Sequence, residues 1–561
     1  MNLYEKWVAH PEMDATLKKQ LLEMNDIEKQ DAFYTDLQFG TAGMRGILGP
    51  GSNRMNIYVI RKANLGFGKW IASKGKEACK RGVAIAYDNR HFSRVFAEES
   101  ARVLASLGIN AYIFESLRPT PELSFAVRAL HCFGGIVITA SHNPKEYNGY
   151  KVYDENGCQL IPELIDKVID YVNEVVDPLS ITIELSPEDE DRIHWIGKEL
   201  DESYYEKVLS IQLRPEMKKD IKIVFTPQHG TALEAVKEVY KRAGYPYYLV
   251  EEQCSPDPDF THTVTPNPED ERAYQLAIEY AEKIDADIAI ATDPDADRVG
   301  VVVKHNGNYQ LLSGNQTGAI LMEYLFSTMQ EKDLMPKKPL MFNTIVTLDL
   351  GEKVASFYGV ETEKTLTGFK FIGDRIAYYE KTKEKDFVFG YEESYGYLIQ
   401  AFVRDKDAVQ ACLMIAECSA YYFNQNRTLV DVLESLYQQH DYYRESQVSK
   451  SFEGKKGAEE MQAIMERLRK EDIRQVASVS VIAKEDYLEG IRFVDGKETE
   501  MKELPSADVL KFYLEDGSWI AIRPSGTEPK CKFYYCIKAE TEEEANQKEI
   551  QYKEAIGKLL E

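Results

Sequence analysis

The chain has 561 residues, of which 44% are hydrophobic and 29% are charged, and its formal net charge is −25. This length exceeds what one core supports and predicts about three to five domains, while the negative charge disfavours nucleic acids and acidic membranes as partners. No apolar run approaches the roughly 18 residues that cross a bilayer, and the first residues lack the apolar core of a signal peptide, so we expect a cytoplasmic protein.

One pattern of elements occurs three times after an N-terminal helical extension. Each copy has a short apolar strand, a helical stretch, a second strand, and a third strand that ends in a polar loop. Such alternation indicates α/β domains with mixed, largely parallel sheets, in which ligands bind beyond the carboxyl ends of the strands. The strands fall within 82–90, 110–123 and 134–144 in the first copy, 221–230, 245–253 and 286–298 in the second, and 339–347, 359–370 and 386–397 in the third.

The last part of the chain has a different pattern. An apolar stripe indicates a helix over 457–470, and strands joined by turns follow it, so we expect a smaller C-terminal α+β domain. The charged segment 183–192 is expected at the surface. The eight cysteines contain no CxxC pair, which predicts reduced and mostly buried thiols and argues against zinc. We predict four domains, at 1–204, 205–322, 323–440 and 441–561.

The first polar loop follows an apolar strand in GGIVITASHNPKEYNGYK, residues 134–151. It contains Ser141, but the nucleophile elbow of hydrolases needs glycine two residues on either side of its serine, and Thr139 and Asn143 stand there instead. The nearby His142 and Lys151 are candidates for moving protons or binding oxygens, although a loop histidine is often only a hydrogen-bonding residue. The loop therefore needs an explanation other than hydrolase chemistry.

The second polar loop, ATDPDADRVG, places Asp293, Asp295 and Asp297 at alternate positions. On a flat strand these residues would lie ~6.6 Å apart, too far to share one ion, so chelation requires a tight loop. Three carboxylates suit Mg²⁺, whereas a calcium EF-hand would need Gly and Glu where Arg298 and Lys304 stand. A solvated acidic turn is the alternative interpretation, and the preceding buried-type strand disfavours it.

Two further loops carry groups suited to a phosphorylated sugar. RPSGTEPK, residues 523–530, combines the Arg523 guanidinium with hydroxyls and a glycine, which suit a phosphate dianion. GYEESYGY, residues 390–397, offers Glu392 and Ser394 to sugar hydroxyls between tyrosines. Taken alone, each loop is as typical of an ordinary turn as of a ligand-binding loop. The chain has no Walker loop and no GxGxxG motif, so nucleotide binding is unsupported.

These loops, in this order, resemble the four signatures of the α-D-phosphohexomutase superfamily, matched here by TASHNP, DPDADR, GYEES and RPSGT. The resemblance covers essentially the whole chain and implies three related α/β domains and a smaller fourth around a central cleft. It implies a phosphorylated Ser141 and one Mg²⁺ per chain, held by Asp293, Asp295 and Asp297 against the phosphoserine. A serine that is already phosphorylated needs no activating base, because catalysis then depends on positioning and charge neutralisation.

The resemblance also implies roles for other residues. GTAGMRG at 40–46 matches the N-terminal active-site segment, LTGFK at 366–370 the specificity loop, and RDKD at 404–407 the run that makes Lys406 a candidate proton shuttle. The implied catalytic residues are Ser141, Arg45, His142, Lys151 and Lys406, and the implied substrate-binding residues are Arg298, Thr367, Gly368, Lys370, Glu392, Ser394, Arg523, Ser525, Gly526 and Thr527.

The implied reaction interconverts glucose 1-phosphate and glucose 6-phosphate through the phosphoserine and a sugar bisphosphate, which also acts as activator. GYEESYGY with RDKD looks closer to phosphoglucomutases than to the GEMSGH loop of phosphomannomutases. Pentose and mannose phosphates remain alternative substrates. A metal-dependent sugar phosphatase and a non-catalytic phosphosugar-binding protein are less favoured. We expect a monomer or homodimer whose partner is the small phosphosugar.

Overall fold

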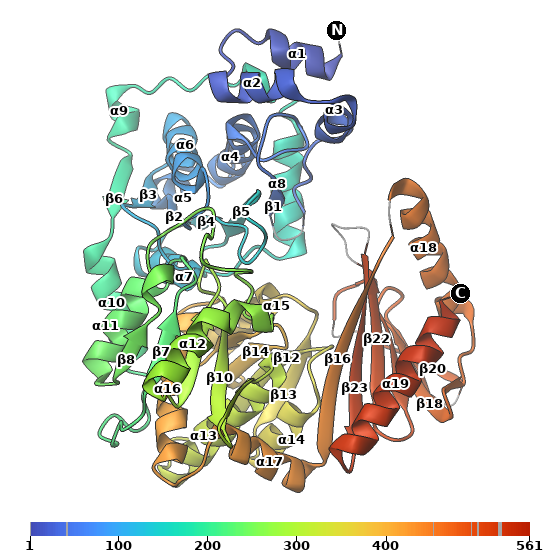
Figure 1. Cartoon of the computed structure of the whole chain (residues 1–561). Coiled ribbons are helices and arrows are strands. Elements are labelled where there is room, and N and C mark those ends of the chain that lie inside the picture. The colour runs from blue at the N-terminus through green and yellow to red at the C-terminus, as the bar shows by residue number, and fades with distance from the viewer. Residues whose placement is uncertain are drawn as a thin grey trace. The chain divides into compact units, whose positions relative to one another are not determined.

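The structure is a computed structural model that describes residues 2–40, 43–452, 454–494, 496–501, 504–524 and 530–560 (Figure 1). The chain divides into two compact units. No helix in the described ranges is long and apolar enough to cross a membrane. Unit 1 comprises residues 1–317, 336–339 and 369–428, and unit 2 comprises 318–335, 340–368 and 429–561.

Unit 1 begins with short helices, which confirm the predicted N-terminal helical extension. Asn2, Asp14 and Asn25 each cap a helix by accepting backbone N–H groups of its first turn. The indole of Trp7 packs edge-on against the ring of Tyr58, with centroids 5.5 Å apart, and so anchors the extension on the first α/β domain. These helices are α1 (Leu3–Ala9), α2 (Ala15–Glu23) and α3 (Asp26–Phe33).

The first sheet has the strand order β1-β5-β4-β2-β3-β6, with β4, β2, β3 and β6 parallel and with β5 and β1 antiparallel to their neighbours. Phe67 of α4 lies beside Gly134 on one face, and Val127 of α7 beside Gly135 on the other, so helices cover both faces. The strands are β1 (Met44–Ile47), β2 (Val83–Tyr87), β3 (Ala111–Phe114), β4 (Gly134–Ile138), β5 (Tyr147–Tyr153) and β6 (Ile193–Ile196), and the helices are α4 (Ile57–Ala72), α5 (Lys76–Arg81), α6 (Ser93–Ser106), α7 (Thr120–Ala129), α8 (Pro162–Asn173) and α9 (Pro187–Glu190). The predicted surface segment 183–192 contains α9 and has no buried residue.

The second sheet has the order β11-β10-β9-β7-β8, again with parallel and antiparallel pairs. Alanines of α12 pack against alternate small residues of β9, which explains the alanine-rich sequence of both. Its strands are β7 (Ile223–Thr226), β8 (Tyr247–Leu249), β9 (Ile288–Thr292), β10 (Val299–His305) and β11 (Asn308–Leu311), accompanied by α10 (Lys198–Leu209), α11 (Leu233–Ala243) and α12 (Gln275–Ile284). Unit 1 also contains α15 (Phe369–Thr382), β14 (Asp386–Glu392), β15 (Gly396–Leu398) and α16 (Ala408–Phe423), and α13 (Gly314–Glu331) begins in it.

Each polar loop of unit 1 joins a strand to an antiparallel return strand. β4 pairs with β5, β9 with β10, and β14 with β15, so a loop is fixed by strand pairing at both ends. The sequence pattern predicts the first strand of each pair and its loop but not the return strand. Short apolar runs do not reveal whether the chain turns back or crosses over.

Unit 2 contains parallel strands β12 and β13 and a large antiparallel sheet with α18 and α19, and the sheet confirms the predicted C-terminal α+β domain. Alternate residues of β21 to β23 form one core with both helices. The elements are β12 (Pro339–Thr344), α14 (Leu350–Phe357), β13 (Glu361–Thr365), α17 (Leu429–His440), β16 (Tyr442–Ser451), α18 (Gly454–Lys470), β17 (Gln475–Val476), β18 (Val479–Asp486), β19 (Ile491–Val494), β20 (Lys497–Glu500), β21 (Leu510–Leu514), β22 (Trp519–Pro524), β23 (Lys530–Ala539) and α19 (Glu542–Leu559). Of the eight cysteines, none forms a disulfide and six are buried.

A buried lysine joins this sheet to the segment after β12. Lys511 of β21 is fully buried, and its Nζ donates a hydrogen bond of 2.8 Å to the carbonyl oxygen of Ile345. The same Nζ lies 3.9 Å from the ring centre of Trp519. Burial lowers the pKa of Lys511 to about 7, and the neighbouring charge of Lys364 acts in the same direction. The lysine therefore loses its charge near neutral pH in the folded state.

We expect Lys511 to make the stability of the protein depend on pH. Between about pH 7 and pH 10 the unfolded chain binds a proton at this lysine that the folded chain does not bind, so the free energy of unfolding rises with pH by at most about 1.4 kcal/mol per pH unit. Lys511→Met removes this contribution. Urea unfolding at pH 7, 8 and 9 measures the slope, with the exposed Lys497→Met as control. An unchanged slope in Lys511→Met would contradict the assignment.

Candidate active site

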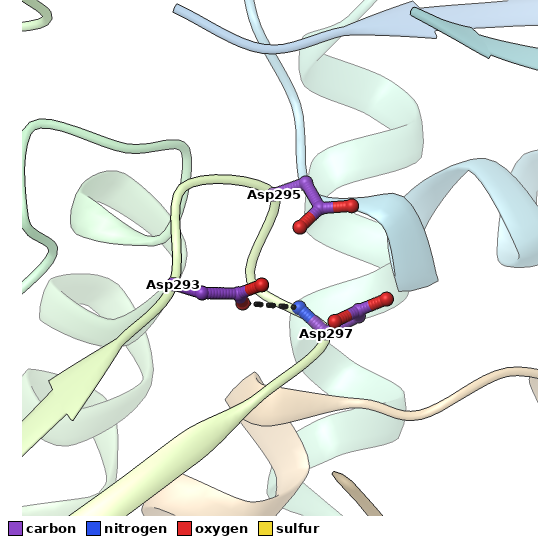
Figure 2. A group of neighbouring side chains, drawn as sticks. All are labelled: Asp293, Asp295 and Asp297. Carbon is purple, nitrogen blue, oxygen red and sulfur yellow. Dashed lines mark hydrogen bonds between the residues drawn. The ribbon is translucent and has the colours of Figure 1, made fainter. Parts of the chain in front are cut away.

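The loop after β9 forms a buried cluster of three carboxylates (Figure 2). Asp293, Asp295 and Asp297 are each at most 2% exposed, and oxygens of all three lie within 4.8 Å of one another. The loop is tight because Ala296 adopts a left-handed conformation and Asp293 Oδ1 accepts the N–H groups of Asp297 (3.1 Å) and Arg298 (2.9 Å). It therefore meets the condition that chelation of one ion requires.

Ser141 lies directly against this cluster. Its Oγ donates a hydrogen bond of 2.7 Å to Asp293 Oδ2, although 152 residues separate the two in the sequence. The ring Nδ1 of His142 is 3.3 Å from the same Oγ. The backbone at Ser141 is left-handed, with φ +51°, and its N–H donates to Thr139 Oγ1 at 2.8 Å. The serine loop and the carboxylate loop thus form one site within unit 1.

Two lysines neutralise part of the cluster. Lys151 Nζ is 2.9 Å from Asp295 Oδ2 and 3.6 Å from Asp297 Oδ2. Lys406 Nζ is 3.1 Å from Asp297 Oδ2 and 3.1 Å from Asp405 Oδ1. Both lysines come from segments that the sequence analysis selected, one from the return strand β5 and one from the RDKD run.

The carboxylates differ in how well they are neutralised. Burial opposes ionisation of Asp295, yet Lys151 and its hydrogen bonds hold the pKa of Asp295 below its ordinary value. Burial, together with the charges of Asp295 and Asp297, raises the pKa of Asp293 well above its ordinary value. Asp295 Oδ1 and Asp297 Oδ1 are buried and accept no hydrogen bond from the described residues. These oxygens and the under-neutralised Asp293 fit a hard divalent cation such as Mg²⁺.

His142 and Lys406 differ in charge at neutral pH. Burial, reinforced by Arg298 and Arg45, lowers the pKa of His142 well below its ordinary value, so the imidazole is neutral. Burial opposes the charge of Lys406, but Asp297 and Asp405 more than offset this and raise its pKa. The site therefore combines a neutral proton acceptor beside Ser141 with a permanent cation beside Asp297.

Three residues make contacts in this site that were not predicted from the sequence. Thr120, at the start of α7, donates through Oγ1 to Asp295 Oδ2 at 2.9 Å and through its N–H to the Asp295 carbonyl oxygen at 2.8 Å. Glu269 accepts a hydrogen bond from Arg298 Nη1. Asp405 accepts one from Tyr153 at 2.8 Å and pairs with Lys406. Only Asp405 carried a signal, as a member of the RDKD run, because the others are distant in sequence from the loops they support.

Other predicted site residues of unit 1 lie on the elements around these loops. Arg45, on β1, donates to Asn143 Oδ1 of the serine loop at 2.7 Å. Glu392 ends β14 and is buried, and its charge acts on both Arg298 and Lys406. Ser394 lies in the turn between β14 and β15, and Lys370 is buried in the first turn of α15.

The remaining predicted residues belong to unit 2 or lie outside the described ranges. Thr367 and Gly368 precede α15, and Gly368 has a φ of +113°, which a side chain would disfavour. Arg523 lies on β22 opposite Lys532 of β23. Ser525, Gly526 and Thr527 lie outside the described residues. The binding roles of all these residues stay predictions.

Four family descriptions match consecutive parts of the chain. They are phosphoglucomutase/phosphomannomutase alpha/beta/alpha domain I (residues 36–177), domain II (202–307), domain III (313–440) and the C-terminal domain (453–552). Proteins named phosphoglucomutase are similar along almost their whole length: one from Staphylococcus epidermidis is 39% identical over 520 residues (91% of this chain, 92% of that one), and one from Staphylococcus aureus is 37% identical over 547 residues (97% of each).

Solved structures share the fold at low sequence identity. A phosphoglucomutase/phosphomannomutase family protein from Burkholderia thailandensis has a TM-score of 0.67 at 17% identity, covering 93% of this chain and 97% of that one. The open form of the phosphoglucomutase pp63/parafusin from Paramecium has a TM-score of 0.65 at 19% identity, covering 91% of each chain.

We expect Gly396→Ala to impair catalytic turnover without unfolding the protein. A β-carbon at Gly396 would lie 2.0 Å from Cδ of Lys406, so the lysine side chain must move away from Asp297. A displacement of about 1 Å in an active site can reduce the rate about a hundredfold, so we expect kcat to fall by about 10- to 100-fold while the urea midpoint changes little. The control is Gly557→Ala, where no atom lies within 4 Å. Unchanged kcat in Gly396→Ala would contradict the role given to Lys406.

Proposed function

The chain belongs to the phosphoglucomutase/phosphomannomutase family of the α-D-phosphohexomutase superfamily and is a phosphosugar mutase, and we propose that it interconverts glucose 1-phosphate and glucose 6-phosphate. The observation that carries the choice of glucose is the similarity, at 37–39% identity over more than nine tenths of the chain, to proteins named phosphoglucomutase. The GYEESYGY and RDKD segments support the same choice.

We propose that Ser141 carries the phosphoryl group. The free hydroxyl of the hexose phosphate attacks phosphorus and gives up its proton, the bond from phosphorus to Ser141 Oγ breaks and Oγ takes up a proton to become a hydroxyl again, and a hexose bisphosphate results. The bisphosphate then turns over in the site, and its other phosphoryl group returns to Ser141. The support is the position of the buried Ser141, whose Oγ lies 2.7 Å from Asp293 Oδ2, beside carboxylates that pair with Lys151 and Lys406. The same bisphosphate would phosphorylate an unphosphorylated Ser141 and so activate the enzyme.

We propose that Asp293, Asp295 and Asp297 hold Mg²⁺, which supplies positive charge to the transferring phosphoryl oxygens when it is bound. Lys151, Lys406 and Arg298 add charge around the same position, and Arg45 extends this charge to the serine loop. Phosphoserine carries about −1.5 to −2 charges, so this concentration of cations offsets it.

We propose His142 as the acceptor for the proton that the Ser141 hydroxyl loses when the phosphoryl group returns. The imidazole is neutral, because burial lowers its pKa, and its Nδ1 is 3.3 Å from Oγ. Lys406 is protonated and held by Asp297 and Asp405, so in this state it acts as a cation and not as a base.

Intact-mass measurement tests the phosphoserine. After incubation with glucose 1,6-bisphosphate the protein is expected to gain one phosphate on Ser141, and Ser141→Ala is expected to gain none and to lose isomerisation by at least about 10³-fold, since it lacks the hydroxyl that carries the transferred phosphoryl group. Ser106→Ala, a change on α6 where the serine Oγ donates a hydrogen bond to the Val103 carbonyl oxygen of the same helix, serves as control. A phosphate that persists in Ser141→Ala would place the phosphoryl group elsewhere.

Steady-state kinetics test the choice of sugar. We expect kcat/KM for glucose 1-phosphate to exceed those for mannose 1-phosphate and ribose 1-phosphate. Release of inorganic phosphate is measured in the same reactions, because a phosphatase would form it in place of the isomerised sugar. A tenfold preference for ribose 1-phosphate would replace glucose by a pentose, and a tenfold preference for mannose 1-phosphate would make the chain a phosphomannomutase.

A further inference from the structure

The serine loop has a conformation that its own residues do not stabilise well. Ser141 is in the left-handed region, which is strained for a residue other than glycine. Between Thr139 and Tyr147 the loop forms few internal backbone hydrogen bonds, namely Asn143 N–H to the Ala140 carbonyl oxygen and Tyr147 N–H to the Pro144 carbonyl oxygen. Several of its carbonyl groups therefore need donors from elsewhere.

A single side chain supplies those donors. The Arg90 guanidinium donates to the carbonyl oxygens of Ser141 (2.5 Å), Asn143, Pro144 (2.8 Å) and Tyr147 (3.1 Å). The planar guanidinium presents five N–H groups in fixed directions, so it can hold several carbonyl groups at once. The side chain is 0% exposed, and it comes from the loop after β2, more than fifty residues before the serine.

Arg90 is itself held on two sides. Its Nε is 3.3 Å from Asp88 Oδ2, and Asp88 accepts hydrogen bonds from Ser93 Oγ (2.6 Å) and from the N–H of Arg90 (2.9 Å). The charge of Arg90 is thereby balanced by a buried carboxylate. The contacts with Asp88 thus fix the orientation from which the guanidinium donates to the serine loop.

The second side is covered by a segment of the neighbouring α/β domain. The guanidinium carbon of Arg90 lies 5.2 Å from the ring centre of Phe260, which is 5% exposed. The same segment accepts a hydrogen bond from Asn89 Nδ2 at the Asp257 carbonyl oxygen (2.9 Å), and Asp259 pairs with Lys145 of the serine loop (3.2 Å). The domain that supplies the carboxylate loop thus also closes over the support of the serine loop.

We propose that Arg90 is a positioning residue for phosphoryl transfer: it fixes the carbonyl groups of residues 141–147 so that Ser141 Oγ faces Asp293, and Phe260 keeps Arg90 in place. Arg90 contacts no reacting atom, and this role rests on the proposed function of Ser141. Lysine at this position would keep the charge but could not reach four carbonyl groups in different directions. The substitution Arg90→Lys therefore separates the effect of the positive charge from the effect of the hydrogen-bond geometry.

The test compares Arg90→Lys with Arg61→Lys, which alters the Arg61–Glu99 ion pair (2.5 Å) in the same domain. For Arg90→Lys we expect kcat to fall at least about a hundredfold, as for a misplaced nucleophile, with KM for glucose 1-phosphate within threefold of wild type. The Kd for Mg²⁺, measured by calorimetry on the dephosphorylated protein, should also stay within threefold, a result that general disruption of the site would not give. Arg61→Lys should retain kcat within twofold. A kcat of Arg90→Lys within threefold of wild type would overturn the proposal.

Phe260→Leu is the second variant and keeps the test decisive if Arg90→Lys does not fold. It retains Arg90 and removes only the ring, so we expect kcat to fall about tenfold with unchanged KM, and a kcat within twofold of wild type would overturn the proposal. Failure of the proposed function would be distinct, because then the wild-type protein itself would carry no phosphate on Ser141, whereas failure of the positioning role is visible only in the variants.

Discussion

Three aspartates of one short loop are buried with their oxygens within 4.8 Å of one another, and the surrounding structure compensates for their mutual repulsion. Carboxylates without partners are costly to bury, because burial and like charges both oppose ionisation. The compensating cations come from separate segments: Lys151 from the first domain, Arg298 from the loop itself and Lys406 from the segment after β15. The packing of these segments is therefore coupled to the ionisation of one loop.

The effect of burial on a lysine depends on its neighbours, as two lysines of this chain demonstrate. Lys511 is fully buried, the side chain of Lys406 is 12% exposed, and burial opposes the charge of both. Lys406 faces Asp297 and Asp405 and stays protonated, whereas Lys511 lies against an indole ring and near another lysine, so its pKa falls to about 7. The first is suited to stabilise phosphoryl oxygens, and the second joins two elements of unit 2.

The sequence was most informative where the residues of the site lie close together in the chain. Asp293, Asp295 and Asp297 lie within five residues after an apolar strand, so their convergence could be predicted, and the serine loop was predicted from the same pattern. The residues that support these loops could not be predicted in this way. Thr120, Glu269 and Arg90 act on loops tens of residues away, and nothing in their local pattern distinguishes them from ordinary surface or capping residues. The return strands were missed because alternation of short apolar runs does not specify the direction of the chain.

The return strands place a limit on how such a site can diversify. Val137 is paired with Lys151 and Ile138 with Tyr150 across the serine loop, and neighbouring strand residues point to opposite faces of the sheet. A shift of this pairing by one residue would invert the side to which Lys151 points and withdraw it from the carboxylates. The position of Lys151 beside the carboxylates is thus tied to the register of β4 and β5, whereas the composition of the loop between the two strands is not.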